Sequence, residues 1–229
     1  MKKYSLNNQI EKVLMGKATN FLNPIDTRYV INRLKSMDFP YKIFYLYEEA
    51  EKLIVYNDDV DITLFEIESK TLLTHSQILG SLFSHNLDDS MFGDIVITND
   101  KYYIAIVNKL KSYFINNFSM VGKNKIKLHE VSLNQVRDFT PKYKKLKISI
   151  SSLRIDNVIS KVIPTSRTIS KELIDDDKVF INYEILNNKN YSLKENDIFS
   201  IRGVGKFKLV NIGALTKNNK YQIVIKKYI

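Results

Sequence analysis

The chain has 229 residues, carries a formal net charge of +10 at pH 7 and contains no cysteine. The absence of thiols excludes disulfides, cysteine nucleophiles and cysteine-based zinc sites. The three histidines, His75, His85 and His129, lack the spacing of metal ligands, so we expect no metal and no cofactor. The chain has no apolar run of about 20 residues, which a membrane span requires, and no apolar signal block follows its first residues. We therefore expect a cytoplasmic protein without a membrane partner.

The positive charge is confined to the last part of the chain. Residues 1–140 contain 17 basic and 17 acidic residues, whereas residues 141–229 contain 18 basic and 8 acidic residues, a net charge of +10. A surface that is merely rich in lysine would spread the excess over both parts. The confinement favours a polyanionic partner for residues 141–229.

The predicted fold class is α+β, and its first element is a helical N-terminal region over residues 1–40. Ile10, Val13 and Leu14 recur at helical spacing. A second helix begins at Pro24, which suits a first helical turn, and ends before Pro40.

Residues 41–131 form the second predicted unit, an α+β domain that opens with a hairpin of strands 42–46 and 52–56. Strand, helix, strand, strand, helix and strand then follow at 62–67, 75–83, 94–98, 102–107, 109–118 and 125–130. This is the order of ferredoxin-like and RNA-recognition folds. Thr74 is expected to cap the first of these helices, and Asn99-Asp100 to form a turn.

Tyr102 and Tyr103 lie on the strand where RNA-recognition domains place aromatic residues that stack on bases. The glycine-rich signature that normally accompanies them is missing. Aromatic residues are common in strands in general. Packing of both tyrosines in the core or on the surface is therefore the favoured alternative.

A basic linker is expected at residues 132–146, and the third unit at residues 147–229. This unit begins with a short helix whose apolar face includes Ile155 and Val158 and which ends at Pro164. A second helix follows from Ser166, its expected N-cap. Strands are predicted at 179–181, 198–201, 207–212 and 221–225, with a hairpin turn at 216–220.

The start of this second helix has the features of an anion site. Backbone N–H groups are unpaired at a helix N-terminus, where the helix dipole is positive. Arg167 lies in the first turn, where a carboxylate would favour the helix and a cation is unfavourable unless an anion binds. Arg154 precedes the first helix and Lys171 lies one turn beyond Arg167, so the three cations can share one face. A solvated arginine beside a simple Ser166 cap is the alternative.

The segment Arg202-Gly-Val-Gly-Lys-Phe-Lys208 is the second basic feature. It is not a phosphate-binding P-loop, because Ser200 stands in the place of the first glycine. Gly203 and Gly205 favour a bulge or a close approach of the backbone to a partner. Arg202, Lys206 and Lys208 alternate and are expected on one side of a strand, with Phe207 on the other side.

The third unit resembles the alpha-L RNA-binding domain, which is named after ribosomal small-subunit protein four. The resemblance rests on Leu-Arg-Ile-Asp at 153–156, Ser-Arg at 166–167, Lys171, Val-x-Ile-Asn at 179–182 and Glu-Asn-Asp-Ile at 195–198. Members usually have glycine at the positions of Asp177 and Asn196. Asp and Asn tolerate a left-handed backbone better than other residues with a side chain, so both substitutions fit the same turns.

Further motifs make the chain similar, nearly end to end, to the bacterial YlmH family. They are Phe-Leu-Asn-Pro at 21–24, Leu-Thr-His-Ser-Gln-Ile-Leu-Gly at 73–80, Phe-Gly-Asp-Ile-Val at 92–96, Val-Gly-Lys at 121–123 and Arg-Gly-Val-Gly-Lys-Phe-Lys-Leu at 202–209. The resemblance implies an RNA-recognition-like middle domain and a C-terminal alpha-L domain. It also implies binding of rRNA or tRNA on large ribosomal subunits in ribosome-associated quality control.

The expected role is that of a non-catalytic, monomeric RNA-binding protein. Its contacts to structured RNA are predicted at Arg154, Ser166, Arg167, Lys171, Asn182, Arg202, Gly203, Lys206 and Lys208. The chain lacks the motifs of methyltransferases and tyrosyl-tRNA synthetases, and Arg154-Ile-Asp156 only superficially resembles a pseudouridine synthase motif. An RNA-modifying enzyme with a site in residues 41–131, or a protein-interaction scaffold formed by the first 140 residues, are the alternatives.

Overall fold

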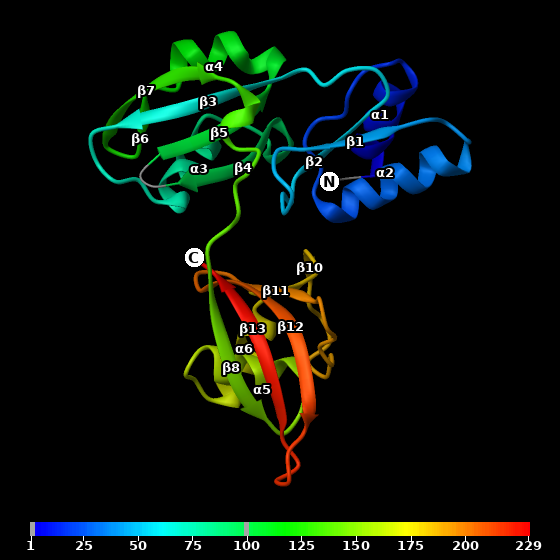
Figure 1. The fold of residues 1–229 in the computed structure, drawn as a ribbon, viewed down its shortest axis with the longest axis vertical. Coiled ribbons are helices and arrows are strands. Elements are labelled where there is room, and N and C mark those ends of the chain that lie inside the picture. Colours follow the sequence, from blue (N-terminus) through cyan, green and yellow to red (C-terminus); the bar gives the residue numbers. More distant parts are fainter. Residues whose placement is uncertain (1–2, 99–100) are drawn as a thin grey trace. The chain divides into compact units, whose positions relative to one another are not determined.

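The computed structural model describes residues 3–98 and 101–229 and divides into two compact units, residues 1–140 and residues 141–229 (Figure 1). The boundary coincides with the change in charge, so the net charge of +10 belongs to the second unit. Residues 1–40 and 41–131, predicted as separate units, lie within one compact unit. Residues 143–146 of the predicted linker belong to a strand of the second unit. No helix in the described ranges is long and apolar enough to cross a membrane.

The first unit begins with two helices and a two-stranded antiparallel sheet. Their bounds are α1 Lys3–Leu14, α2 Pro24–Ser36, β1 Lys42–Tyr45 and β2 Leu53–Tyr56. Helix α2 begins at Pro24, as predicted, and the side chain of Asn23 accepts hydrogen bonds from the backbone N–H groups of Ile25 and Asp26. Buried apolar side chains of both helices pack on Val55 of β2. This core burial stabilises the short helices, which are marginal in isolation.

A five-stranded antiparallel sheet with the order β4-β5-β3-β7-β6 forms the rest of the unit. Its elements are β3 Ile62–Ser69, α3 His75–Ser84, β4 Phe92–Thr98, β5 Lys101–Val107, α4 Lys111–Asn117, β6 Met120–Val121 and β7 Asn124–Val131. The predicted order is confirmed, apart from the additional two-residue β6. Thr74 caps α3 in a capping box with Gln77. The predicted turn at Asn99-Asp100 lies outside the described residues.

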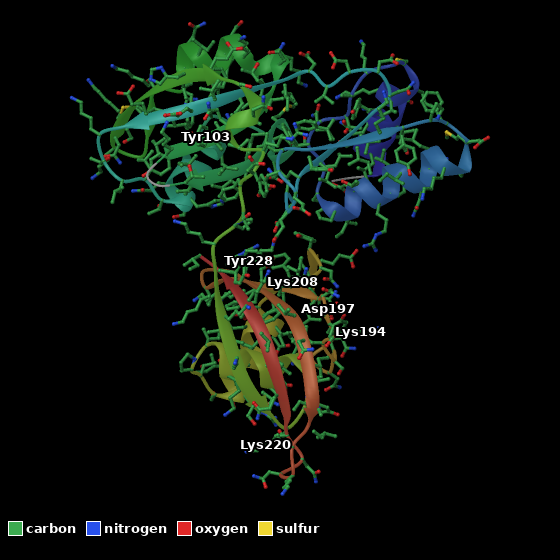
Figure 2. The ribbon with its side chains drawn as sticks, in the orientation of Figure 1. Tyr103, Lys194, Asp197, Lys208, Lys220 and Tyr228 are labelled. Carbon is green, nitrogen blue, oxygen red and sulfur yellow. The ribbon has the colours of Figure 1, made fainter. Side chains whose placement is uncertain are left out.

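Tyr102 and Tyr103 are core residues, with 3% and 2% of their surfaces exposed. Tyr102 packs on the side of α3 and α4, and its hydroxyl accepts a hydrogen bond of 2.8 Å from the backbone N–H of Leu73. Tyr103, labelled in Figure 2, packs on the opposite side with Phe21 and Leu46. The core alternative is therefore correct, and these two rings are not available for stacking on bases.

Gly93 allows Phe21 to pack closely against β4. A Cβ atom at this position would lie 2.9 Å from Cε1 of Phe21, which is itself buried. We expect Gly93→Ala to lower the free energy of unfolding by about 1–3 kcal/mol, because the ring must move within a packed core. Urea unfolding followed by circular dichroism measures this loss.

Gly80→Ala is the matched control, since Gly80 is exposed on α3 and a Cβ atom there would contact nothing within 4 Å. Alanine favours the helix by up to about 1 kcal/mol over glycine. This variant should be as stable as the parent or more stable. Equal destabilisation by both substitutions would contradict the close approach of Phe21 as the cause.

The second unit is a six-stranded antiparallel sheet, ordered β10-β9-β11-β12-β13-β8, with two helices. The elements are β8 Tyr143–Ile150, α5 Ile155–Val162, α6 Arg167–Asp175, β9 Val179–Ile181, β10 Glu184–Ile185, β11 Ile198–Ile201, β12 Gly205–Leu215 and β13 Tyr221–Tyr228. In the view of Figure 1, β8, β12 and β13 lie in front of α5 and α6. Phe199 and Phe207 stack at 5.0 Å in the core beneath the helices. The predicted elements are present, whereas β8 and β10 were not predicted.

Candidate nucleic-acid interface

Arg154 is held at the start of α5 by a buried carboxylate. Its Nε and Nη2 atoms donate hydrogen bonds of 3.2 and 3.0 Å to the two carboxylate oxygens of Asp156. The Asp156 side chain is 2% exposed, whereas that of Arg154 is 43% exposed. A two-point pair of this kind fixes the plane of the guanidinium group. Arg154 is thus an oriented cation that solvent and ligands can still reach.

Asp156 of α5 also interacts electrostatically with Arg167 of α6. Burial raises the pKa of Asp156, but the hydrogen bonds and charge of Arg154, the backbone N–H of Asn157 and the charge of Arg167 outweigh it and hold the pKa below its usual range. The carboxylate is therefore ionised at neutral pH. Because Arg167 contributes to this shift, its charge lies within electrostatic range of the Arg154–Asp156 pair. The predicted convergence of Arg154 and Arg167 fits this arrangement.

Helix α6 begins as predicted. The Ser166 hydroxyl accepts a hydrogen bond of 3.1 Å from the backbone N–H of Ile169. Arg167 and Lys171 are exposed, one turn apart on the same helix. Among the described residues, neither has a carboxylate within 4 Å of its cationic group, so their charge is not neutralised by an ion pair. An anion at this helix start would meet two cations and the positive end of the helix dipole.

Asn182 has a clear role within the fold. Its backbone is left-handed, with φ of 48°. The side-chain amide donates to Oδ1 of Asp197 at 2.9 Å and accepts from the backbone N–H of Ile198 at 3.0 Å. Both ends of the amide are therefore used inside the protein. Asn182 shapes the turn between β9 and β10, and its predicted contact to RNA stays a prediction.

The second basic feature differs in part from its prediction. Arg202 and Gly203 lie in the turn between β11 and β12, so Arg202 does not share a strand face with the two lysines. Gly203, with φ of +80°, lies in this turn and not in a bulge, and Gly205, with φ of +134°, is the first residue of β12. Lys206 and Lys208 alternate with the buried Phe207 on β12, as expected.

Lys206 is a partly buried cation. Its Nζ atom donates to the Tyr183 hydroxyl at 3.3 Å and lies 5.1 and 5.2 Å from the ring centres of Tyr183 and Tyr228. Burial, and then the charge of Lys208, lower the pKa of Lys206 to about 8. Tyr228 and Lys208 lie toward one end of the second unit in Figure 2, and Lys220 lies at the opposite end of the β12–β13 hairpin.

Two further basic residues lie beside these lysines; Lys226 was missed from the sequence, and Lys145 was predicted only as part of the basic linker. Lys226 of β13 stands directly opposite Lys208, and Lys145 of β8 stands directly opposite Lys226. Lys145 belongs to the stretch predicted as a linker. The alternation of Leu146, Ile148 and Ile150 in this stretch is the signal that could have revealed a strand.

Comparisons with known proteins give a family match, a curated relative and a solved structure. Residues 56–135 match the family model described as "Putative RNA-binding domain in YlmH". The ribosome-associated protein quality control protein P2 of Bacillus subtilis (strain 168) is 26% identical over 153 residues, covering 67% of this chain and 60% of that protein. The chain thus aligns with about 60% of the length of this curated relative. A solved structure of the cell division protein ylmH from Streptococcus pneumoniae aligns at 21% identity and a TM-score of 0.46, covering 59% of this chain and 92% of that one.

The family match falls on the sheet of the first unit, from the end of β2 to the residues after β7. The motifs at 73–80, 92–96 and 121–123 that carry the sequence resemblance lie within this range. The resemblance to the YlmH family is thereby confirmed for residues 56–135, which match the model of the putative RNA-binding domain in YlmH.

Proposed function

We propose that this chain is a non-catalytic RNA-binding protein of the translation apparatus. In this proposal it binds rRNA and tRNA on the large ribosomal subunit during ribosome-associated quality control. It acts in the cytoplasm as a monomer, and its second unit is the alpha-L RNA-binding domain. The YlmH domain match and the name of the Bacillus subtilis relative support RNA and ribosomes as partners.

The observation that carries the proposal is the charge of the second unit and its arrangement at α5 and α6. The unit holds the entire net charge of +10. Arg154 is oriented by Asp156, and Arg167 and Lys171 lie without an ion-pair partner among the described residues at the start of α6. Such a site suits the phosphate backbone of structured RNA, which is recognised mainly by shape and phosphate contacts.

Cosedimentation with separated ribosomal subunits tests the partner. We expect the protein to sediment with the large subunit, and crosslinks to map to 23S rRNA and to tRNA. Equal recovery with the small subunit, or crosslinks scattered over both rRNAs, would contradict the proposed site of action.

Nucleoside analysis tests the non-catalytic role. We expect no change in the modified nucleosides of rRNA or tRNA after incubation with the protein, as measured by mass spectrometry. A new modification that depends on the protein would instead favour an enzyme with its site in residues 41–131.

The pKa of Lys206 predicts a pH dependence of RNA binding. Its ammonium group loses its charge as the pH rises through about 8, so its contribution to binding is present below pH 8 and is lost above it. We expect affinity to fall by about threefold between pH 7 and pH 9, the size of a partly solvated ion pair. Fluorescence anisotropy at constant ionic strength, with a labelled RNA hairpin that carries a single-stranded overhang, measures this change.

Lys206→Arg is the matched variant, because a guanidinium group stays charged over this range. It should bind RNA with nearly constant affinity from pH 7 to pH 9. If the affinity of Lys206→Arg falls between pH 7 and pH 9 as steeply as that of the parent, the pH dependence comes from another group.

A further inference from the structure

The face of the second sheet that points away from α5 and α6 combines lysines with aromatic rings. Phe207, Leu209 and Ile225 point toward the helices and are buried there. Their neighbours along the strands point the other way. We call this second surface the outer sheet face and define it by Tyr143, Lys145, Lys206, Lys208, Lys226 and Tyr228.

Three lysines form a row across neighbouring strands of the outer sheet face. Lys208, Lys226 and Lys145 occupy directly opposed positions on β12, β13 and β8. Like charges in such positions destabilise a sheet. The residues flanking this row on the same face of β8 and β13, which are Tyr143, Lys147, Val224 and Tyr228, include no carboxylate among the described residues. An anion that binds at this row would relieve the repulsion.

Aromatic rings lie beside these cations. Lys226 Nζ lies 3.9 Å from the ring centre of Tyr143, and Lys206 Nζ lies between Tyr183 and Tyr228. Tyr143 and Tyr228 are themselves opposed on β8 and β13. Rings beside a cationic track are typical of surfaces that bind single-stranded nucleic acids, where bases stack on the rings and phosphates meet the cations.

Tyr183 stands where the backbone favours glycine. Asn182 and Tyr183 form the two-residue turn between β9 and β10, with φ of 48° and 74°. Such turns require a left-handed backbone at both positions, and Asn-Gly is the preferred pair. A tyrosine there is strained. Its ring is half-buried, and it is held by Lys206, whose Nζ donates to the Tyr183 hydroxyl at 3.3 Å and lies 5.1 Å from the ring centre.

We propose that the outer sheet face binds an unpaired RNA segment. Bases stack on Tyr183, Tyr228 and Tyr143, and phosphates contact the row formed by Lys145, Lys208 and Lys226. Unpaired RNA is the occupant that uses both features, since bases in a duplex cannot stack on these rings and an acidic peptide has no bases. The proposal rests on the proposed RNA-binding function and adds a surface on the side of the sheet opposite α5 and α6.

Binding of two RNAs to the full chain tests this surface. One is an unstructured RNA of about ten nucleotides, within the site sizes of single-strand-binding folds, and the other is a fully paired RNA hairpin. Tyr183→Gly should weaken binding of the unstructured RNA by roughly five- to hundredfold, the equivalent of one base that no longer stacks on a ring. Its melting temperature should change little, because glycine relieves the strained left-handed turn and this gain offsets the lost contact of Lys206 with the ring. Affinity for the hairpin should be retained.

Lys145→Gln combined with Lys226→Gln is the second variant, and Lys220→Gln at the far hairpin end is the control. The double variant should reduce the dependence of log K on log salt for the unstructured RNA by about 0.7 for each phosphate that is no longer neutralised. Lys220→Gln should change neither the affinity nor the salt dependence.

The outcomes separate this proposal from the function on which it rests. If Tyr183→Gly and the double lysine variant bind the unstructured RNA like the parent, while a charge reversal at Arg167 still weakens hairpin binding, the outer sheet face is not a binding site and the proposed function stands. Displacement of the unstructured RNA by polyglutamate of equal charge as effectively as by a second RNA would also overturn the proposal. If the parent binds neither RNA, both proposals fail.

Discussion

Replacement of Arg167 by glutamate is expected to lower the affinity for structured RNA about a hundredfold and to leave the second unit folded. The change removes a cation that has no ion-pair partner among the described residues at the start of α6 and places a carboxylate near Asp156. A charged hydrogen bond contributes about 1.5–3 kcal/mol, and repulsion between the new carboxylate and phosphate adds to that loss. About 2.7 kcal/mol corresponds to a hundredfold change in affinity.

The fold should be little affected. A carboxylate in the first turn of a helix stabilises it by about 0.3–1 kcal/mol through the helix dipole, which offsets the lost attraction between Arg167 and Asp156. The Ser166 cap is retained in the variant. We therefore expect a melting temperature close to that of the parent. Weak binding by a protein of nearly unchanged stability cannot be attributed to unfolding.

Anisotropy titrations of an RNA hairpin at several salt concentrations measure the effect. The slope of log K against log salt should become shallower by about 0.7–0.9 for the phosphate that Arg167 no longer neutralises. Lys220→Glu makes the same change in net charge at the end of the β12–β13 hairpin and serves as the control. Equal losses of affinity in both variants would show that the total charge, and not the α6 start, determines affinity.

Helix starts and tight turns could be predicted from the sequence, because the residues that form them are neighbours in the sequence. Ser166 and Thr74 cap the helices for which they were predicted. Asp177 and Asn196 stand where the alpha-L domains that the second unit resembles usually have glycine, and both have a left-handed backbone, with φ of 53° and 71°. Their short polar side chains tolerate this conformation, so both substitutions preserve the turns.

Features that depend on pairing between distant segments could not be predicted. Strand β8 contains Lys144, Lys145 and Lys147, and its first residues were predicted to be a linker. It pairs along its whole length with β13, which is the last strand of the chain. Tyr103 is buried by Phe21 and Leu46, which belong to earlier elements of the first unit. In both cases the deciding contacts join residues that are far apart in the sequence.

The two units differ in net charge. Residues 56–135, which match the YlmH RNA-binding family, contain 7 lysines and 10 acidic residues, a net charge of −3. Their strand tyrosines are buried, which removes the stacking contacts that the sequence suggested. In the proposed function, phosphate contacts in the second unit therefore supply most of the affinity for RNA.

Replacement of Asp197 by alanine is expected to destabilise the second unit by about 3 kcal/mol. Asp197 is 8% exposed at the last residue before β11. Its carboxylate accepts hydrogen bonds from Asn182 Nδ2 at 2.9 Å, the Tyr191 hydroxyl at 2.9 Å and the backbone N–H of Lys194 at 2.8 Å. Burial, followed by the hydrogen bond and charge of Asp197, raises the pKa of Tyr191 to about 12. Each donor left without an acceptor costs about 1–3 kcal/mol when buried, and partial solvation reduces the sum.

Hydrogen exchange at increasing urea concentrations measures this destabilisation in the full chain, because peptides from the two units report separately. Peptides spanning β9 and β11 should lose about 3 kcal/mol of protection, whereas those spanning β3 and β5 in the first unit should be unchanged and serve as an internal control. Tyr191→Phe removes a single donor and should cost about 1 kcal/mol. A destabilisation below about 1 kcal/mol for Asp197→Ala would show that water replaces the carboxylate, so that Asn182 does not depend on Asp197 to hold the turn that presents Tyr183.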